Sequence, residues 1–186
     1  MLQCGGMTHA DTDLATRLGQ IAEYEHTVHG TLMTRIFRRL GPTKGFIAFY
    51  RRFGPKVDPW VMRSRRGRTM TRLYGLPGLL LDTTGVKTGL VRTSPLLYIR
   101  DGDDFVVVGT NWGQLAHPAW TANLLAHPQA HIEVAQVRVA VEAELVDQVC
   151  WDRNWTRFCA VYAGYARYLE TCGDRVPRMF LLHPAA

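Results

Sequence analysis

The sequence lacks the features that mark a membrane-spanning or secreted protein. Its 186 residues contain no apolar run of about 18 residues, which is the length that a transmembrane helix requires. No basic segment followed by an apolar one stands near the N-terminus, so we expect no secretory signal. The composition excludes disorder, because 47% of the residues are hydrophobic and only 20% are charged.

Paired cysteines and metal-binding motifs are also missing. The chain has four cysteines: Cys4, Cys150, Cys159 and Cys172. None belongs to a C-x-x-C pair, so we expect reduced thiols rather than disulfides. His127 and His131 are four residues apart, but Pro128 lies between them and would break a helical face. We therefore expect no metal site.

Acidic residues are nearly absent from residues 35–72, which hold twelve Lys and Arg against Asp58 alone. Such a basic surface suits a nucleic acid, an anionic membrane surface or a polyanionic small molecule. A solvated helix face is the ordinary alternative. No nucleic-acid-binding module accompanies the charge, so we expect no nucleic-acid partner. We expect a cytoplasmic protein, and the basic stretch leaves open a peripheral position at the inner face of the membrane.

The hydrophobic pattern changes along the chain and predicts two parts. Residues 1–75 form a basic, helical N-terminal extension, with a helix predicted over 11–40. Residues 76–186 form a strand-rich domain. Strands are predicted at 79–84, 92–100, 105–110, 130–135, 137–146 and 178–182, with a short helix at 117–125 and a long one at 147–170. About six antiparallel strands suit an α+β fold built on a small closed or split barrel, and pairing of the first and last strands would remove its edges.

The turn between the first two predicted strands is the most informative stretch. Lys87 and Arg92 lie on it among hydroxyl side chains and two glycines, Gly85 and Gly89. Backbone amides, hydroxyls and two positive charges at one point suit an anionic group such as a phosphate. The turn is not a P-loop, because a strand rather than a helix follows it. The alternative is a hairpin whose charged tip is simply solvated.

Three separate motifs then occur in order. The first is Thr84-Gly85-x-Lys87-Thr88-Gly89-x-x-Arg92-Thr93-x-Pro95-Leu96. The second joins Asn111-x-Gly113 to His117-Pro118-x-Trp120-x-x-Asn123-Leu124-x-x-x-Pro128, and the third joins Tyr162-x-x-Tyr165-x-x-Tyr168 to Arg175-x-Pro177. Together, over about residues 77–184, they resemble the deazaflavin-dependent nitroreductases, which bind coenzyme F420. The resemblance implies a split β-barrel of the FMN-binding type.

The resemblance also implies an F420-dependent oxidoreductase. Its cofactor would be reduced F420 (F420H2), which delivers a hydride from the deazaflavin C5 to an electron-poor acceptor such as a quinone, an enone or a nitro compound. Two alternatives stay open, because a fold does not decide a ligand. One is a split barrel that binds FMN or haem, and the other is a non-catalytic F420-binding or membrane-surface protein. A homodimer is a further expectation.

The resemblance implies that the cofactor-binding residues lie on the hairpin, the following loop and the short helix. They are Lys87, Thr88, Arg92, Thr93, Ser94, Pro95, Leu96, Gly109, Thr110, Asn111, Ala119, Trp120, Asn123 and Leu124. Lys87 and Arg92 would hold the phosphate, with Thr88 and the turn amides as neutral donors. The basic cluster 63–72 would extend toward the glutamate tail of the cofactor. For Trp120 and Leu124 a place in the hydrophobic core is an equal alternative.

Tyr162 and Tyr165 are the candidate catalytic residues. An acceptor that takes a hydride develops negative charge at its oxygen, so a nearby hydroxyl donor would stabilise it. Packing of these tyrosines as an aromatic helix face is at least as strong an alternative. Two positions depart from the family pattern: Val86 replaces an often basic residue, and Trp112 replaces a common glycine and adds bulk at the mouth of the site.

Overall fold

The computed structural model describes residues 9–27 and 76–185. The basic stretch 35–72, and with it most of the predicted N-terminal extension, lies outside the described residues. The described elements are helix α1 (His9–Thr27), strands β1 (Gly78–Thr84), β2 (Val91–Asp101) and β3 (Asp104–Val108), the short turn η1 (Asn111–Gly113), helix α5 (Ala119–Ala126), strands β4 (Gln129–Val134) and β5 (Val137–Leu145), helices α6 (Gln148–Val161) and α7 (Gly164–Thr171), and strand β6 (Met179–Ala185).

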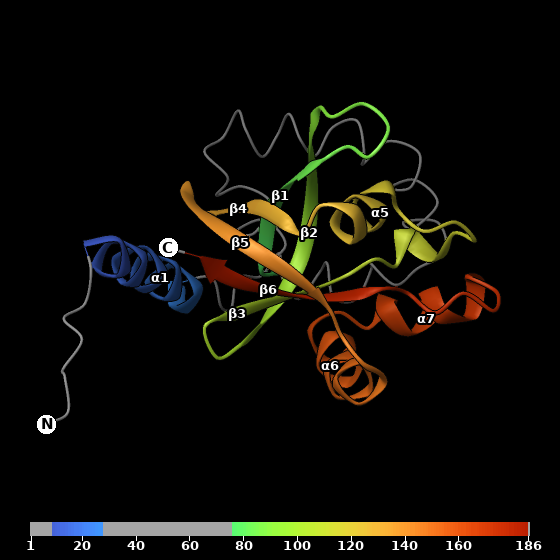
Figure 1. Cartoon of the computed structure of the whole chain (residues 1–186). Coiled ribbons are helices and arrows are strands. Elements are labelled where there is room, and N and C mark those ends of the chain that lie inside the picture. The colour runs from blue at the N-terminus through green and yellow to red at the C-terminus, as the bar shows by residue number, and fades with distance from the viewer. Residues whose placement is uncertain (1–8, 28–75, 186) are drawn as a thin grey trace, which may run out of the picture.

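The six strands form a closed antiparallel barrel in the order β1-β2-β3-β6-β5-β4 (Figure 1). This confirms the predicted fold class, but the predicted closure was wrong. The first strand pairs with β4, and the last strand lies between β3 and β5. The reason is that the β4–β5 hairpin places its β4 edge against β1. Only β6 then remains to fill the gap between the free edges of β3 and β5.

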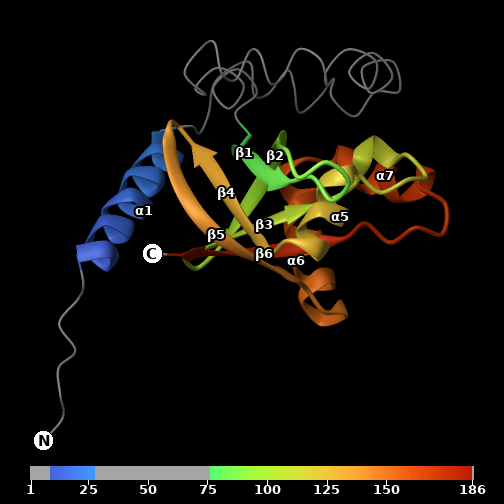
Figure 2. The same cartoon turned by 45° about the horizontal axis from the view of Figure 1, so that its top comes forward.

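Helices α1 and α5 lie at opposite sides of the barrel (Figures 1 and 2). Both contribute to an interior core: Ile21 of α1 is fully buried, and Trp120 of α5 packs against Phe180 with ring centroids 5.8 Å apart. The Tyr98 hydroxyl, inside the barrel, donates to Glu25 of α1 at 2.6 Å. The described part of the predicted extension therefore packs into the barrel. No helix in the described ranges is long and apolar enough to cross a membrane.

The long helix predicted over 147–170 is two helices. Asp147 caps α6 by accepting from the Cys150 N–H at 2.8 Å, and α6 ends where Tyr162 adopts an extended backbone (φ −145°, ψ 108°). The ring of Tyr162 folds back over Gly164, where an added Cβ would lie 2.2 Å from a ring carbon. Only glycine permits this approach, so the tyrosine spacing of three does not run along a single helix.

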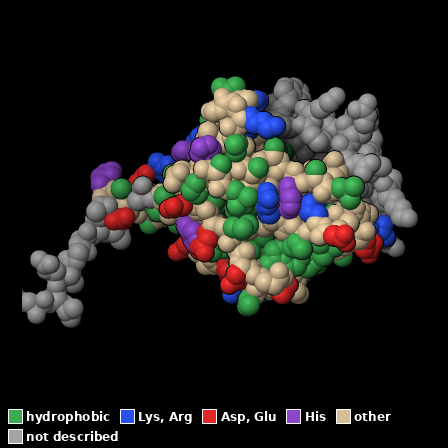
Figure 3. Space-filling model, turned by 45° about the vertical axis from the view of Figure 1, so that its right-hand side comes forward, with side chains coloured by type: hydrophobic (Ala, Val, Ile, Leu, Met, Phe, Trp, Pro, Cys, Tyr) green, Lys and Arg blue, Asp and Glu red, His purple; other side chains and the backbone are tan. Residues whose placement is uncertain are grey.

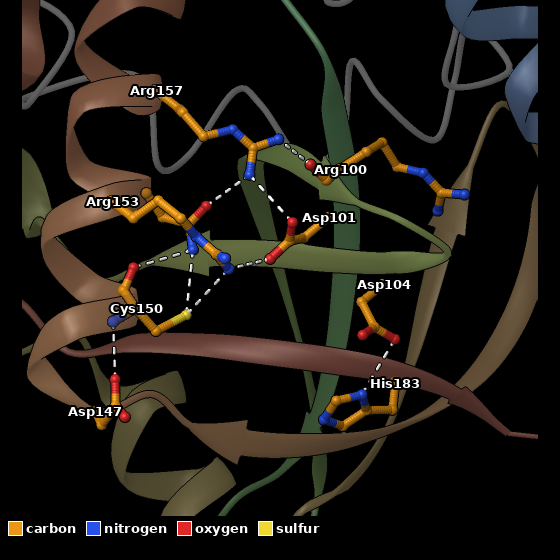
Figure 4. Close-up of polar contacts among 9 residues, drawn as sticks. Arg100, Asp101, Asp104, Asp147, Cys150, Arg153, Arg157 and His183 are labelled. Carbon is orange, nitrogen blue, oxygen red and sulfur yellow. Dashed lines mark hydrogen bonds and ion pairs between the residues drawn. The ribbon is translucent and has the colours of Figure 1, made fainter.

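Helix α6 is fastened to the turn between β2 and β3 by two arginines (Figure 4). Arg153 pairs with the Asp101 carboxylate at 2.5 Å, and Arg157 pairs with the same carboxylate at 3.5 Å and donates to the Arg100 carbonyl. The fastening holds α6 against the outside of the barrel. A second hydrophobic cluster, called the outer cluster below, forms between this outside face and helices α6 and α7. Its buried members are Leu76, Ile99, Val106, Val108, Phe158, Tyr162, Tyr165, Tyr168 and Met179.

Candidate functional site

The hairpin between β1 and β2 exposes two cations. Lys87 and Arg92 are both exposed, and in the part of the chain that the structure describes neither makes an ion pair. The prediction that the turn amides are free to bind an anion was wrong for most of them. The N–H groups of residues 85, 88, 89 and 90 all donate within the turn, because a six-residue turn closes on itself. Anion binding here therefore falls to side chains.

Asn123 on α5 fixes the position of this hairpin. Its side chain, 6% exposed, accepts from the Val86 N–H at 3.2 Å and donates to Thr83 Oγ1 at 3.0 Å. Both contacts join residues that are far apart in sequence. A buried amide that satisfies a backbone donor and a hydroxyl is costly to remove, since both partners would be left unpaired. Asn123 thus holds the cationic turn at a fixed place beside α5.

The loop after β3 makes an unusual turn. Asn111, Trp112 and Gly113 have φ values of 48°, 55° and 71°, so three consecutive residues are left-handed. Such a conformation is routine for glycine and tolerated by asparagine, but it is strained for tryptophan. An added Cβ at Gly113 would lie 2.0 Å from Thr171 Oγ1, because the turn packs directly on α7.

Arg175 binds the carbonyl groups of this loop. Its guanidinium donates to the carbonyls of Gly109 at 2.9 Å, Thr110 at 2.7 Å and Gln114 at 2.9 and 3.1 Å. Removal from water lowers the pKa of Arg175 from its ordinary value, although the guanidinium stays charged. A planar fork with five donors suits three carbonyls at once, so Arg175 links the segment after α7 to the loop after β3.

Basic and histidine side chains gather on the face that carries α5 and α7, above a band of hydrophobic side chains (Figure 3). His117 precedes α5 and is half-buried. Burial lowers its pKa, and the neighbouring charges of Arg178 and Arg175 lower it further, so the imidazole is neutral near pH 7. Arg178 also donates to Thr121 Oγ1 at 3.4 Å. The positive charge beside His117 therefore comes from Arg175 and Arg178.

The three tyrosines form one aromatic group in the outer cluster. Tyr162, Tyr165 and Tyr168 are 5%, 5% and 4% exposed, and Tyr165 lies 5.8 Å from each of the other two rings in edge-on contact. Burial raises the pKa of each phenol above its usual range. All three stay protonated at physiological pH, so each is able to donate a hydrogen bond but does not act as a base.

The structure brings some of the predicted residues together and separates others. Lys87, Thr88 and Arg92 share the hairpin tip, and the Thr93 hydroxyl donates to Asp82 at 2.6 Å. Of the other predicted positions, Ser94, Pro95 and Leu96 are half-exposed on β2. Gly109 and Thr110 after β3 are buried, Asn111 is half-exposed, and Ala119 at the start of α5 is exposed. Trp120 and Leu124 are 6% and 2% exposed in the interior core, which is the alternative that their spacing left open. Tyr162 and Tyr165 lie apart from the hairpin, on the outer cluster.

Two features of the site were not predicted. Arg175 was noted only as part of a motif, and its place after the tyrosines, followed at two residues by a proline, was the available signal. The left-handed turn at Trp112 had Gly113 as its only local signal, because a single glycine does not reveal the conformation of its neighbours. Among residues 9–27 and 76–185, no group of three or more His, Cys, Asp or Glu side chains is placed to hold a metal ion.

Comparison with known proteins identifies a family whose sequences this chain matches. The model of the F420H(2)-dependent quinone reductases matches residues 56–182. An F420H(2)-dependent quinone reductase of Mycobacterium tuberculosis is 41% identical over 87 residues, which is 46% of this chain and 58% of that protein. A solved F420-H2 dependent reductase, FDR-A, is 26% identical with a TM-score of 0.52, covering 57% of this chain and 94% of its own. Another solved structure, described as a domain-swapped dimer, is 25% identical with a TM-score of 0.54, covering 68% of this chain and 96% of its own.

Proposed function

Because the chain belongs to the F420H(2)-dependent quinone reductase family, we propose that it reduces a quinone with electrons from reduced F420. The matched stretch spans little more than half the length of the mycobacterial relative. We therefore argue the activity from the family and from the site, and we do not transfer the activity of the whole relative. The observation that carries it is the hairpin, where Lys87 and Arg92 stand exposed on a turn that Asn123 holds in place.

The residues present fit the anionic end of F420. Lys87 and Arg92 supply two charges that no carboxylate neutralises within the described residues, and the Thr88 hydroxyl lies between them in sequence. Charged donors bind a phosphate more strongly than neutral ones, so the engagement of the turn amides leaves this role to the two cations. The basic cluster 63–72 is proposed to reach the glutamate tail.

When bound, F420H2 supplies the hydride, and the protein supplies position and a hydrogen-bond donor. Reduction of a quinone to a hydroquinone consumes one hydride and one proton, and we assign the proton to solvent. Tyr162 and Tyr165 are proposed to donate to the quinone oxygen as it gains charge. Their raised pKa supports a donor role, and their burial requires that the acceptor reach the edge of the outer cluster.

Two further partners are proposed, an anionic membrane surface and a second copy of the chain. We propose a cytoplasmic protein that lies at the inner face of the membrane, because the basic stretch 35–72 suits an anionic membrane surface. The solved relative described as a domain-swapped dimer supports a homodimer. Co-sedimentation with anionic vesicles of the full chain tests the first idea, and equal binding by a variant in which the 63–72 arginines are changed to glutamine would contradict it.

A fluorescence titration with oxidised F420, run in parallel with FMN, tests the cofactor. We expect F420 to bind and Lys87→Ala and Arg92→Ala each to weaken it about tenfold, the loss of one charge-assisted contact. Arg153→Ala, which removes a cation on α6 remote from the hairpin, is the control and is expected to leave the dissociation constant unchanged. Binding of FMN alone would overturn the cofactor, and equal effects in all three variants would overturn the role of the hairpin.

A further inference from the structure

The left-handed turn at Trp112 is a strained feature that the proposed function has not used. Tryptophan at φ 55° and ψ 29° is unfavourable, and it follows Asn111 in the same conformation. Backbone strain of this kind persists only where the surrounding structure enforces it, and it gathers at functional sites. An ordinary right-handed turn would direct the Trp112 side chain elsewhere, so the strain is the means by which the indole is placed.

Contacts on every side enforce this turn. Within it, the N–H groups of Gly113 and Gln114 donate to the carbonyls of Thr110 and Asn111, both at 3.0 Å. The Asn111 side chain donates to the Ala116 carbonyl at 2.9 Å. Arg175 then binds the carbonyls of Gly109 and Thr110 before the turn and of Gln114 after it. All four of its hydrogen bonds go to carbonyls of residues 109–114, so they stabilise the conformation of that loop.

The turn places the Trp112 indole beside the tyrosine group. The ring lies edge-on to Tyr168 with centroids 6.0 Å apart, and it packs on the outer cluster while remaining half-exposed. It contacts Tyr168, whose ring lies 5.8 Å from that of Tyr165 and 6.4 Å from that of Tyr162. In sequence it directly follows the candidate cofactor positions Gly109, Thr110 and Asn111. A large, flat and half-exposed ring beside the tyrosine group offers a surface to a flat partner, since aromatic rings favour stacked or edge-on contact.

We propose that Trp112 determines acceptor specificity and that Arg175 is the residue that positions it. The inference rests on the proposed function and names the acceptor class within it: flat quinones of one or two rings without bulky ring substituents. In this proposal the indole narrows the space through which a quinone reaches Tyr162 and Tyr165. A wider approach would accept quinones with long or branched substituents on the ring.

Two substitutions at Trp112 test whether its indole excludes quinones with bulky substituents. Trp112→Gly removes the indole and suits the left-handed backbone, whereas Trp112→Phe keeps an aromatic ring. The measured quantity is the ratio of kcat/KM for a bulky, isoprenoid-substituted naphthoquinone to that for menadione. We expect Trp112→Gly to raise this ratio at least about tenfold, and Trp112→Phe to raise it less than about threefold. An unchanged ratio in Trp112→Gly would overturn the proposal.

Arg175→Lys tests the positioning role, and Arg157→Lys is its matched control. Both replace a guanidinium that binds backbone carbonyls by an ammonium that lacks the planar fork. Both are expected to lower Tm, but only Arg175→Lys is expected to raise the quinone ratio toward that of Trp112→Gly. Equal ratios in the two lysine variants would show that Arg175 acts on stability alone and would overturn its positioning role.

The dissociation constant for F420, from fluorescence quenching, separates this inference from the proposed function. We expect the wild type to bind F420 and Trp112→Gly to bind it within about threefold of the wild type. A wild type that does not bind F420 would overturn the proposed function, and the inference with it. Normal F420 binding together with an unchanged quinone ratio in Trp112→Gly would overturn the inference alone.

Discussion

The interior core and the outer cluster are built from similar side chains but differ in what else they contain. The interior core is largely aliphatic, and its polar tyrosine, Tyr98, has a partner in Glu25. The outer cluster holds three phenols, borders half-buried tryptophans and supports a strained turn. Packing alone explains the interior. The outer cluster keeps features that packing does not require, which is the mark of a region shaped by function.

Removing the same ring from each region tests this difference and gives the largest effect. Phe105 and Phe158 are both fully buried, the first inside the barrel and the second 5.3 Å from the Tyr165 ring. We expect Phe105→Ala and Phe158→Ala each to lower the free energy of unfolding by about 3–5 kcal/mol, measured by urea denaturation. Well below Tm, only Phe158→Ala should raise KM for the quinone. A KM raised equally by both variants would break the distinction.

Hydroxyl deletions sharpen the comparison within the outer cluster. Tyr162→Phe and Tyr165→Phe remove a donor and keep the ring. For a residue that donates to the acceptor, we expect kcat/KM to fall about tenfold, which corresponds to 1.4 kcal/mol of lost transition-state stabilisation. Tyr98→Phe is the control from the interior core, and it should change stability but not kcat/KM. If kcat/KM is untouched in both outer variants, neither tyrosine is the donor.

The smallest effect is expected at a histidine on β6 that belongs to neither region. His183 contacts Asp104 and Glu144, each at 3.1 Å (Figure 4 shows the first contact). Partial burial would lower the pKa of His183, but the hydrogen bond to Glu144 and the charge of Asp104 outweigh it and raise the pKa above its ordinary value. The contacts therefore add stability at acidic pH that is lost as the pH rises through the raised pKa.

The measurement is the difference in unfolding free energy between the wild type and His183→Gln from pH 5 to pH 9. We expect a difference of a few tenths of a kcal/mol at pH 5, because His183 is 39% exposed and solvent screens the charges. The difference should vanish at the upper end of the range. A difference that grows with pH would show that the imidazole is neutral in these contacts.

The sequence predicted the strands well because each strand has its own local signal. Strands β4 and β5 were predicted to within one residue at each end, from alternation around residues 131–134 and 139–145. The pairing of the strands was predicted less well. Alternation shows which face of a strand is buried, but it does not show which strand lies beside it. Closure through β1 and β4 depends on the whole set of edges, and no single segment encodes it.

The candidate site divides in the same way. The cations of the hairpin could be named from the motifs, because their spacing is local. Asn123 was named as a cofactor-binding residue, and its hydrogen bond to the hairpin was not predicted. The engagement of the turn amides, the break at Tyr162 and the left-handed Trp112 could not be predicted from the motifs. The first two depend on backbone geometry within a few residues, which the residue types alone do not reveal. The turn at Trp112 depends on Arg175, which lies more than sixty residues beyond the carbonyls of Gly109 and Thr110 that it binds.

The position of β6 in the barrel has a consequence for synthesis on the ribosome. Strands β3 and β5 emerge long before β6, and until it arrives each presents an unpaired edge. Unpaired edges are the surfaces at which strands of different chains join. Folding of this domain therefore stays incomplete until β6 has left the ribosome. A nascent chain stalled before residue 179 would expose the unpaired edges of both β3 and β5. The same insertion that seals the finished barrel leaves the growing chain with two open strand edges until β6 has been made.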